Sequence, residues 1–177
     1  MKKLLLIAIV AIVTTTFTHA QNGFGVKAGF NSLSLRVSAD GVSASESASG
    51  FYLGVFNNFK ASDKVGIQAE LQFVNVSEDG ESSSVLALPV MANINVADKF
   101  NLLAGPQLDL LLDDDAEGIK KLGIGLGTGA AYDISQNVSL EVRYVLGLSN
   151  RLEDNEIEGI ELDTKFNYLQ IGLGYKF

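Results

Sequence analysis

The chain has 177 residues, a formal net charge of −8, no cysteine and a single histidine, His19. This length fits one domain. The acidic balance excludes nucleic acid as a partner, because phosphate binding draws its affinity from Lys and Arg. The absence of Cys, and the place of His19 in a segment that we expect to be removed, exclude most nucleophilic triads and transition-metal sites.

Residues 1–20, "MKKLLLIAIVAIVTTTFTHA", have the layout of a secretory signal peptide. Two lysines precede an apolar run, and small residues precede Gln21, as in the charged, apolar and cleavage regions of such signals. The run is shorter than the roughly 20 residues of a membrane-spanning helix. We predict export and cleavage after Ala20, which leaves residues 21–177 as one domain with 11 of the 13 basic residues against all 21 acidic ones.

Alternation of apolar and polar residues with a period of two runs through the rest of the chain and predicts strands. The eight predicted strands span roughly residues 23–35, 50–60, 65–76, 85–96, 100–111, 121–132, 138–149 and 166–177. Tight turns such as "ASDK" alternate with longer segments at 36–49, 77–84, 112–120 and 150–165, which hold most of the acidic residues. This alternation of short turns and long loops is typical of an outer-membrane barrel. The Ser-rich stretch "VSADGVSASESASG" (37–50) is predicted to be a mobile loop.

One face of every predicted strand is apolar and free of charge, as in "VGIQAELQFV" (65–74). The opposite faces carry Lys27, Asn31, Gln68, Glu70, Gln72, Asn93, Gln107, Asp109, Glu141, Arg143, Gln170 and Lys176. A basic residue on a lipid-facing surface costs about 2–4 kcal/mol at the bilayer midplane. We therefore predict an all-β, eight-stranded antiparallel up-and-down transmembrane barrel in the outer membrane. The alternative is a secreted lipocalin-like barrel, whose apolar face lines a ligand cavity.

Two further patterns favour the membrane barrel. The inner face at 123–131 is almost entirely glycine, which leaves room in a narrow barrel for Arg143, Tyr52, Phe56 and Tyr168. Aromatic residues gather at the short-turn end, as in an interfacial girdle: Phe24, Phe59, Phe100, Tyr132, Tyr175 and Phe177. The only prolines, Pro89 and Pro106, fall within predicted strands, although a closed barrel has no edge for them. We expect them close together, at a local bulge.

Four stretches in this order resemble the PorT-like small outer-membrane β-barrel proteins of Bacteroidota: "LALPVMANINV" (86–96), "FNLLAGPQLDLLL" (100–112), "SLEVRYVLGLSN" (139–150) and "LQIGLGYKF" (169–177). The resemblance implies an eight-stranded barrel. It also implies that the terminal Phe177 belongs to the signal read by the outer-membrane assembly machinery. It implies no activity.

Five inward charges are candidates for a polar network in the interior: Lys27, Glu70, Glu141, Arg143 and Lys176. Antiparallel pairing predicts Glu141 near Lys176, and Arg143 is expected to reach Glu70 across the glycine face. Buried charges require partners. Two interpretations of this network are open: an ion path through the barrel, or a salt-bridged plug that fills the interior and fixes the barrel. The plug is favoured because open aqueous channels belong to barrels of about 16 or more strands.

The acidic stretches "DDDAEG" (113–118) and "EDNEIEGIELD" (153–163) offer carboxylate oxygens of the kind that Ca²⁺ and Mg²⁺ prefer. Neither stretch has the ligand spacing of a calcium loop. We predict no metal, cofactor or catalytic site, and interpret these stretches as a solvated anionic rim or a docking surface for a basic partner.

The predicted protein is a monomeric outer-membrane barrel with a structural or surface-interaction role. Its predicted partners are outer-membrane lipid, lipopolysaccharide, the assembly machinery during biogenesis, and a protein bound at the acidic loops. The alternatives are a narrow pore for small solutes, an accessory component of a protein-secretion system, and the lipocalin-like barrel.

Overall fold

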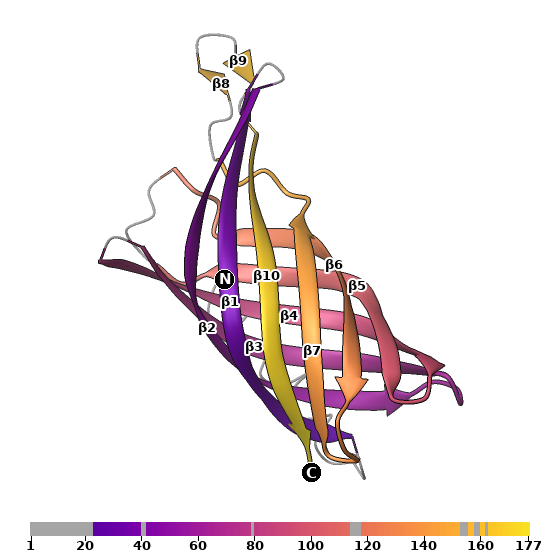
Figure 1. Ribbon diagram of the computed structural model, residues 1–177. Coiled ribbons are helices and arrows are strands. Elements are labelled where there is room, and N and C mark those ends of the chain that lie inside the picture. The colour runs from indigo at the N-terminus through magenta and orange to yellow at the C-terminus, as the bar shows by residue number, and fades with distance from the viewer. Residues whose placement is uncertain are drawn as a thin grey trace, which may run out of the picture.

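Eight long strands close into an antiparallel barrel (Figure 1). The computed structural model describes residues 23–39, 42–78, 80–113, 118–152, 156–157, 160–161 and 163–177; the predicted signal peptide lies outside them. The barrel strands are β1 (Phe24–Ala39), β2 (Val42–Lys60), β3 (Val65–Glu78), β4 (Glu81–Ala97), β5 (Phe100–Leu111), β6 (Leu122–Asp133), β7 (Val138–Gly147) and β10 (Asp163–Lys176). A small hairpin, β8 (Glu156–Ile157) with β9 (Ile160–Glu161), stands apart from the barrel sheet. The predicted fold class is confirmed.

The strands succeed each other around the barrel, and β10 pairs with β1 to close it. We call the end with the turns at 61–64, 98–99 and 134–137 the turn end, and the opposite end the loop end. No helix in the described part of the chain is long and apolar enough to cross a membrane.

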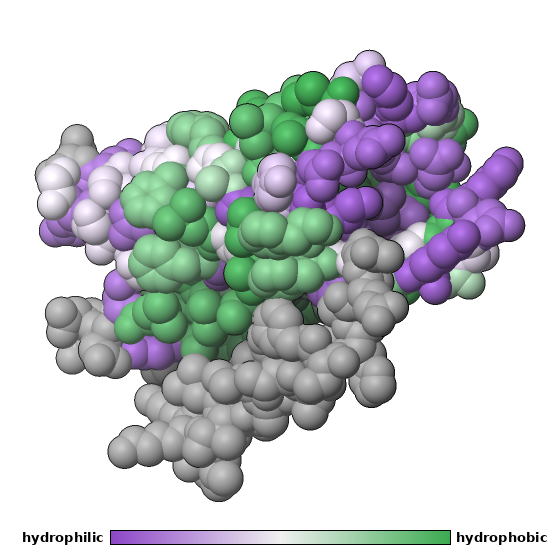
Figure 2. Space-filling view, turned by 90° about the horizontal axis from the view of Figure 1, so that it is seen from below, coloured by the Kyte–Doolittle hydropathy of each residue, from purple (hydrophilic) through white to green (hydrophobic). Residues whose placement is uncertain are grey.

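The two faces of the wall differ as the period of two requires. On β7, Leu140, Val142 and Tyr144 are 40–45% exposed, whereas Glu141 is 6% and Arg143 is 0% exposed. The other strands repeat this pattern, and on the face seen in Figure 2 hydrophobic residues gather between more hydrophilic ends. The apolar face therefore points outward, and the lipocalin-like alternative is wrong.

The wall extends farther toward the loop end than predicted. β1 and β2 remain paired as far as Ala39 and Val42, and β3 and β4 as far as Glu78 and Glu81. Outward serines hydrogen-bond across these hairpins: Ser34 with Ser47 at 2.6 Å, Ser38 with Ser43 at 2.9 Å, and Ser77 with Ser82 at 2.7 Å. Such cross-strand pairs stabilise a sheet. The prediction of a mobile loop at 37–50 is wrong for its described residues, because its serines continue the alternation.

Three strands reach beyond the others at the loop end. β1 pairs with β10 as far as Ser38 opposite Asp163, but β3 ends its pairing with β2 at Ser49 opposite Ser77. We call residues 32–39, 42–48 and 163–169 the tall sheet. In Figure 1, β1 and β10 rise beyond the ends of β5, β6 and β7.

Pro89 and Pro106 come close together, but without the expected bulge. Pro89 lies opposite Gln107, the neighbour of Pro106, and the register of β4 with β5 is the same on both sides of this region. The ladder omits residues 90 and 91, and the register shifts only between Asn95 and Ala97, near the turn. The prolines are therefore accommodated by missing pairs rather than by an inserted residue.

The glycines of β6 admit a different set of side chains from the one expected. A Cβ at Gly123, Gly127 or Gly129 would meet Arg151, Met91 or the β7 backbone beside Arg143, respectively. Tyr52 instead packs over Gly29 and Gly172, and Phe56 over Gly25. The expectation is wrong for Tyr52 and Phe56, which occupy space over glycines of β1 and β10, and at Gly129 the nearest atoms are the Val142 carbonyl oxygen and the Cα and Cβ of Arg143.

Candidate functional site

Four charged side chains meet inside the turn-end half of the barrel, and we call them the ionic cluster: Lys27, Glu70, Glu141 and Arg143. Lys27 projects from β1, Glu70 from β3 and the other two from β7, all on inward positions. The Nζ of Lys27 lies 3.1 Å from Oε1 of Glu70 and 2.9 Å from Oε2 of Glu141. The Nη2 of Arg143 lies 2.5 Å from Oε1 of Glu70 and also pairs with Glu141. Two cations thus bridge two carboxylates from three strands.

Amide side chains extend the ionic cluster across the interior. Gln68 and Gln72 donate to the two oxygens of Glu70 at 2.7 Å and 2.5 Å. Gln170 of β10 donates to Gln72 at 3.0 Å. Ion pairs out of water are stable only when their remaining hydrogen-bonding capacity is met. Glu70 meets this condition through both amides. The neutral ionic cluster joins three strands, and the Gln72–Gln170 hydrogen bond adds β10 as a fourth.

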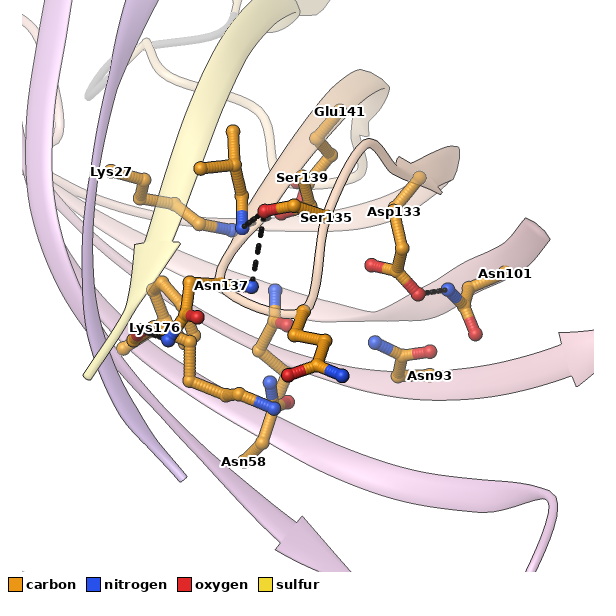
Figure 3. Close-up of a pocket in the computed structure, with 15 residues that line it drawn as sticks. Lys27, Asn58, Asn93, Asn101, Asp133, Ser135, Asn137, Ser139, Glu141 and Lys176 are labelled. Carbon is orange, nitrogen blue, oxygen red and sulfur yellow. Dashed lines mark hydrogen bonds and ion pairs between the residues drawn. The ribbon is translucent and has the colours of Figure 1, made fainter. Parts of the chain in front are cut away.

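Lys176 lies apart from the ionic cluster. Glu141 is opposite Gly172 in the register, so Lys176 falls four residues nearer the turn end. No ion pair joins Lys176 to Glu141 in the described part of the chain. Both residues nevertheless line a polar cavity of about 170 Å³ at the turn end, together with Lys27, Asn58 and Asn93 (Figure 3). Charged and amide groups thus line this mouth of the barrel.

The C-terminal residue anchors the seam where the barrel closes. The ring of Phe177 stacks on Phe24 at a centroid distance of 5.6 Å and meets Tyr175 edge-on at 5.4 Å. Its backbone N–H donates to the carbonyl of Phe24 at 3.0 Å. Phe177 therefore contacts the first barrel strand as well as the last.

The loop-end half of the interior is apolar, which the sequence interpretation missed. Its buried members are Leu33, Tyr52, Val74, Val76, Val85, Ala87, Leu111, Val145, Phe166 and Tyr168. A signal was present, because in "VLAL" (85–88) both faces of the strand are apolar. We call this set the apolar layer. It lies between the ionic cluster and the loop end.

A cleft of about 540 Å³ opens above the apolar layer at the loop end. Its floor and walls include Leu33, Leu35, Val76, Leu111, Ile119 and Phe166. Its rim carries Glu46, Glu78, Glu81 and Asp113. Among the described residues that line it there is no Lys, Arg or His. We call it the loop-end cleft.

Arg151 is a second buried cation that the sequence interpretation missed. It is 1% exposed, forms an ion pair with Asp109 of β5, and donates to the carbonyls of Lys120 and Lys121 at 3.1 Å each. Its guanidinium also lies 4.4 Å from the centre of the Phe166 ring. The signal was a single arginine at the start of an acidic loop. Arg151 ties that loop to the barrel mouth.

The described residues contain no group of three or more Asp, Glu, His or Cys side chains that is arranged to hold a metal ion. Most of the acidic stretch 113–118, and the side chains of 153–162, lie outside the described residues. The prediction that these stretches form an anionic rim or a docking surface therefore stays a prediction.

A closed antiparallel barrel whose outer wall is apolar and whose interior carries buried polar and charged side chains is the architecture of outer-membrane β-barrel proteins. Residues 4–177 match the family described as "Outer membrane protein beta-barrel domain", and the chain belongs to this family. The protein is located in the outer membrane. No curated protein sequence matches the chain.

Solved structures of outer-membrane proteins are similar in fold. The attachment invasion locus protein Ail of Yersinia pestis has 15% identity and a TM-score of 0.54, covering 89% of this chain and 100% of its own. Neisserial surface protein A has 16% identity and a TM-score of 0.51, covering 88% and 97%. The outer membrane enzyme PagL has 11% identity and a TM-score of 0.51, covering 83% and 98%. At these identities the likeness concerns the fold alone.

Proposed function

We propose that the protein is a closed barrel that holds an interaction surface at the loop end, and that it is neither a pore nor an enzyme. The observation that carries this proposal is the filled interior. The ionic cluster blocks the turn-end half with paired charges, and the apolar layer blocks the loop-end half. A solute path would have to break both.

The absence of catalysis is proposed on chemical grounds. The only histidine is His19 in the predicted signal peptide, and the buried carboxylates Glu70 and Glu141 are both held by cations. A general base must be free to accept a proton from the substrate. Neither carboxylate meets that requirement.

Conductance across planar bilayers tests the closed barrel. The refolded full chain is expected to give silent bilayers, and so is Arg36→Ala, which changes an exposed arginine of β1 outside the interior. Stepwise conductance of the wild type that is lost or altered in Arg143→Ala would overturn the proposal in favour of a narrow pore for small solutes.

Biogenesis and partners follow from the same proposal. We propose that residues 1–20 are removed on export, that residues 21–177 form the mature barrel domain, and that the assembly machinery reads the end at Phe177. The barrel then stands as a monomer in outer-membrane lipid and lipopolysaccharide.

The proposed affiliation with PorT-like barrels of Bacteroidota rests on the ordered motifs at 86–96, 100–112, 139–150 and 169–177. If this affiliation is correct, the role that competes with an interaction surface is that of an accessory component of a protein-secretion system. Gentle detergent extraction separates the two roles. Isolation as a lone barrel supports the proposal, and stable co-purification with large envelope complexes favours the secretion role.

A further inference from the structure

The loop-end cleft has one wall with an unusual feature, a strand whose backbone is paired on one side only. Residues 42–48 of β2 pair with β1, but β3 pairs with β2 only from Ser49 onward. Within the described residues, no other strand continues the sheet beside them. A strand edge of this kind presents a row of unused N–H and C=O groups, to which an extended peptide can add.

The opposite edge of the tall sheet, formed by β10, is hydrogen-bonded to other residues of the chain. The backbone N–H of Arg151 donates to the carbonyl of Thr164 at 2.7 Å, and the N–H of Thr164 donates to the side chain of Asn150 at 3.0 Å. The N–H of Gly147 likewise donates to the side chain of Asn167 at 2.9 Å. The chain thus covers the start of the β10 edge with its own residues. Among the described residues, no segment pairs with the β2 edge, which is therefore the edge that a partner can use.

The side chains beside the β2 edge define the chemistry of an added strand. Glu46 and Ala48 line the loop-end cleft, whereas Ser45 and Ser47 alternate with them and face outward. An added strand would therefore turn every second side chain toward Glu46, Ala48 and the apolar floor. The other side chains would lie beside the outward serines.

The carboxylates at the rim of the loop-end cleft determine which charge a ligand must carry. Within the described part of the chain, Glu46, Glu78 and Glu81 form no ion pair, and the carboxylate of Asp113 accepts a hydrogen bond only from the N–H of Ser84, at 3.3 Å. Complementary charge across an interface gives specificity and speeds association. Four carboxylates around an apolar floor thus select a ligand that combines cationic and apolar side chains.

We propose that the loop-end cleft binds an extended peptide segment of a partner protein, which adds to the edge of β2 at residues 42–48. Its inward side chains are alternately apolar and Lys or Arg, and its outward side chains are small and polar. This inference rests on the proposed interaction role and names the class of its partner.

The test uses the full chain in lipid nanodiscs and a labelled synthetic peptide of about ten residues that alternates Thr with Leu and Lys. Binding is measured by fluorescence anisotropy. We expect saturable binding that weakens with added salt, since exposed charges are screened. Two control peptides carry Glu in place of Lys, or N-methyl groups on alternate backbone nitrogens. Both are expected to bind about tenfold or more weakly.

Charge reversal on the protein locates the site. Glu46→Lys and Glu81→Lys should each weaken binding of the Lys peptide about tenfold or more, because like charges then face each other. Asp98→Lys makes the same charge change on an exposed residue at the turn end and should leave binding unchanged. All three residues are exposed, and unheated electrophoretic migration checks that each variant is folded.

Each contrary result has a defined meaning. If Glu46→Lys, Glu81→Lys and Asp98→Lys weakened binding of the Lys peptide equally, the loop-end cleft would not be the binding site. If the N-methylated peptide bound as tightly as the unmodified one, the peptide would not add as a strand. A peptide that does not bind, while bilayers with the wild type stay silent, overturns this site and leaves the closed barrel intact. Conducting bilayers overturn the proposed function whatever the peptide does.

Discussion

The two halves of the barrel interior solve the same packing problem with opposite chemistry. In the turn-end half, Lys27 and Arg143 hold Glu70 and Glu141 in a buried ionic cluster. In the loop-end half, residues such as Val74, Val85 and Phe166 form an apolar layer against the same wall. The stability of the turn-end half depends on specific ion-pair partners, and that of the loop-end half depends on filled volume. We therefore expect different kinds of substitution to lower the free energy of unfolding in the two halves.

The largest effect is expected for Arg143→Met, because among the described residues it leaves Lys27 as the one cation paired with Glu70 and Glu141. Removing one partner of a buried ion pair costs about 3–5 kcal/mol. The free energy of unfolding is measured in a urea series by the fraction that keeps folded migration in unheated gels. Arg36→Met, an exposed arginine whose Nη2 lies 3.4 Å from the Ser43 hydroxyl, is the control and should be nearly neutral. Equal losses in both variants would contradict the cluster.

Reciprocal substitutions across the boundary of the two halves should each cost less. Val74→Thr places a hydroxyl in the apolar layer, where an unpartnered polar group costs about 1–3 kcal/mol. Gln72→Leu, two residues away on β3, removes a donor to the Glu70 carboxylate and costs about 1.5–3 kcal/mol. The same urea series measures both. A neutral result for either would show that the two halves are chemically interchangeable at that point.

Alanine substitutions at two neighbouring glycines of β6 should differ in their effect on stability, because one new Cβ would meet backbone and the other a flexible side chain. A Cβ at Gly129 would lie 2.4 Å from the carbonyl oxygen of Val142, whereas a Cβ at Gly127 would first meet the terminal methyl of Met91 at 3.0 Å. Gly129→Ala should cost about 1–3 kcal/mol through overpacking. Gly127→Ala should stay within about 0.5 kcal/mol of the wild type, because Met91 is flexible. Similar losses at both positions would show that Met91 cannot move.

The sequence predicts the turn-end half of the interior far better than the loop-end half. Alternation identifies the inward side of each strand, so Lys27, Glu70, Glu141 and Arg143 were all assigned to the interior. The partner of Glu141 was not predictable from neighbouring strands alone. Lys27 reaches it because β1 and β7 both flank β10, whereas Lys176 is displaced toward the turn end by the register.

The loop-end half was missed for a physical reason. Where both faces of a strand are apolar, as in "VLAL" (85–88), alternation no longer distinguishes the inward face from the outward face. The serines of β1 and β2 had the opposite effect, since their composition resembles a loop while their spacing continues a strand. The burial of Arg151 was not predictable, because its partners are backbone carbonyls and an aspartate more than 40 residues away. Such contacts exist only after the barrel closes.

The smallest effect is expected for Lys176→Met, and it sharpens the comparison because two lysines line one cavity. The ammonium of Lys27 is held by two buried carboxylates, whereas Lys176 is half-exposed and forms no ion pair with a described residue. Lys176→Met should change the free energy of unfolding by no more than about 0.5 kcal/mol. Lys27→Met should cost several times more, since Arg143 alone cannot neutralise both Glu70 and Glu141. If Lys176→Met proved as damaging as Lys27→Met, the ionic cluster would have to extend to the turn end, as the sequence alone had suggested.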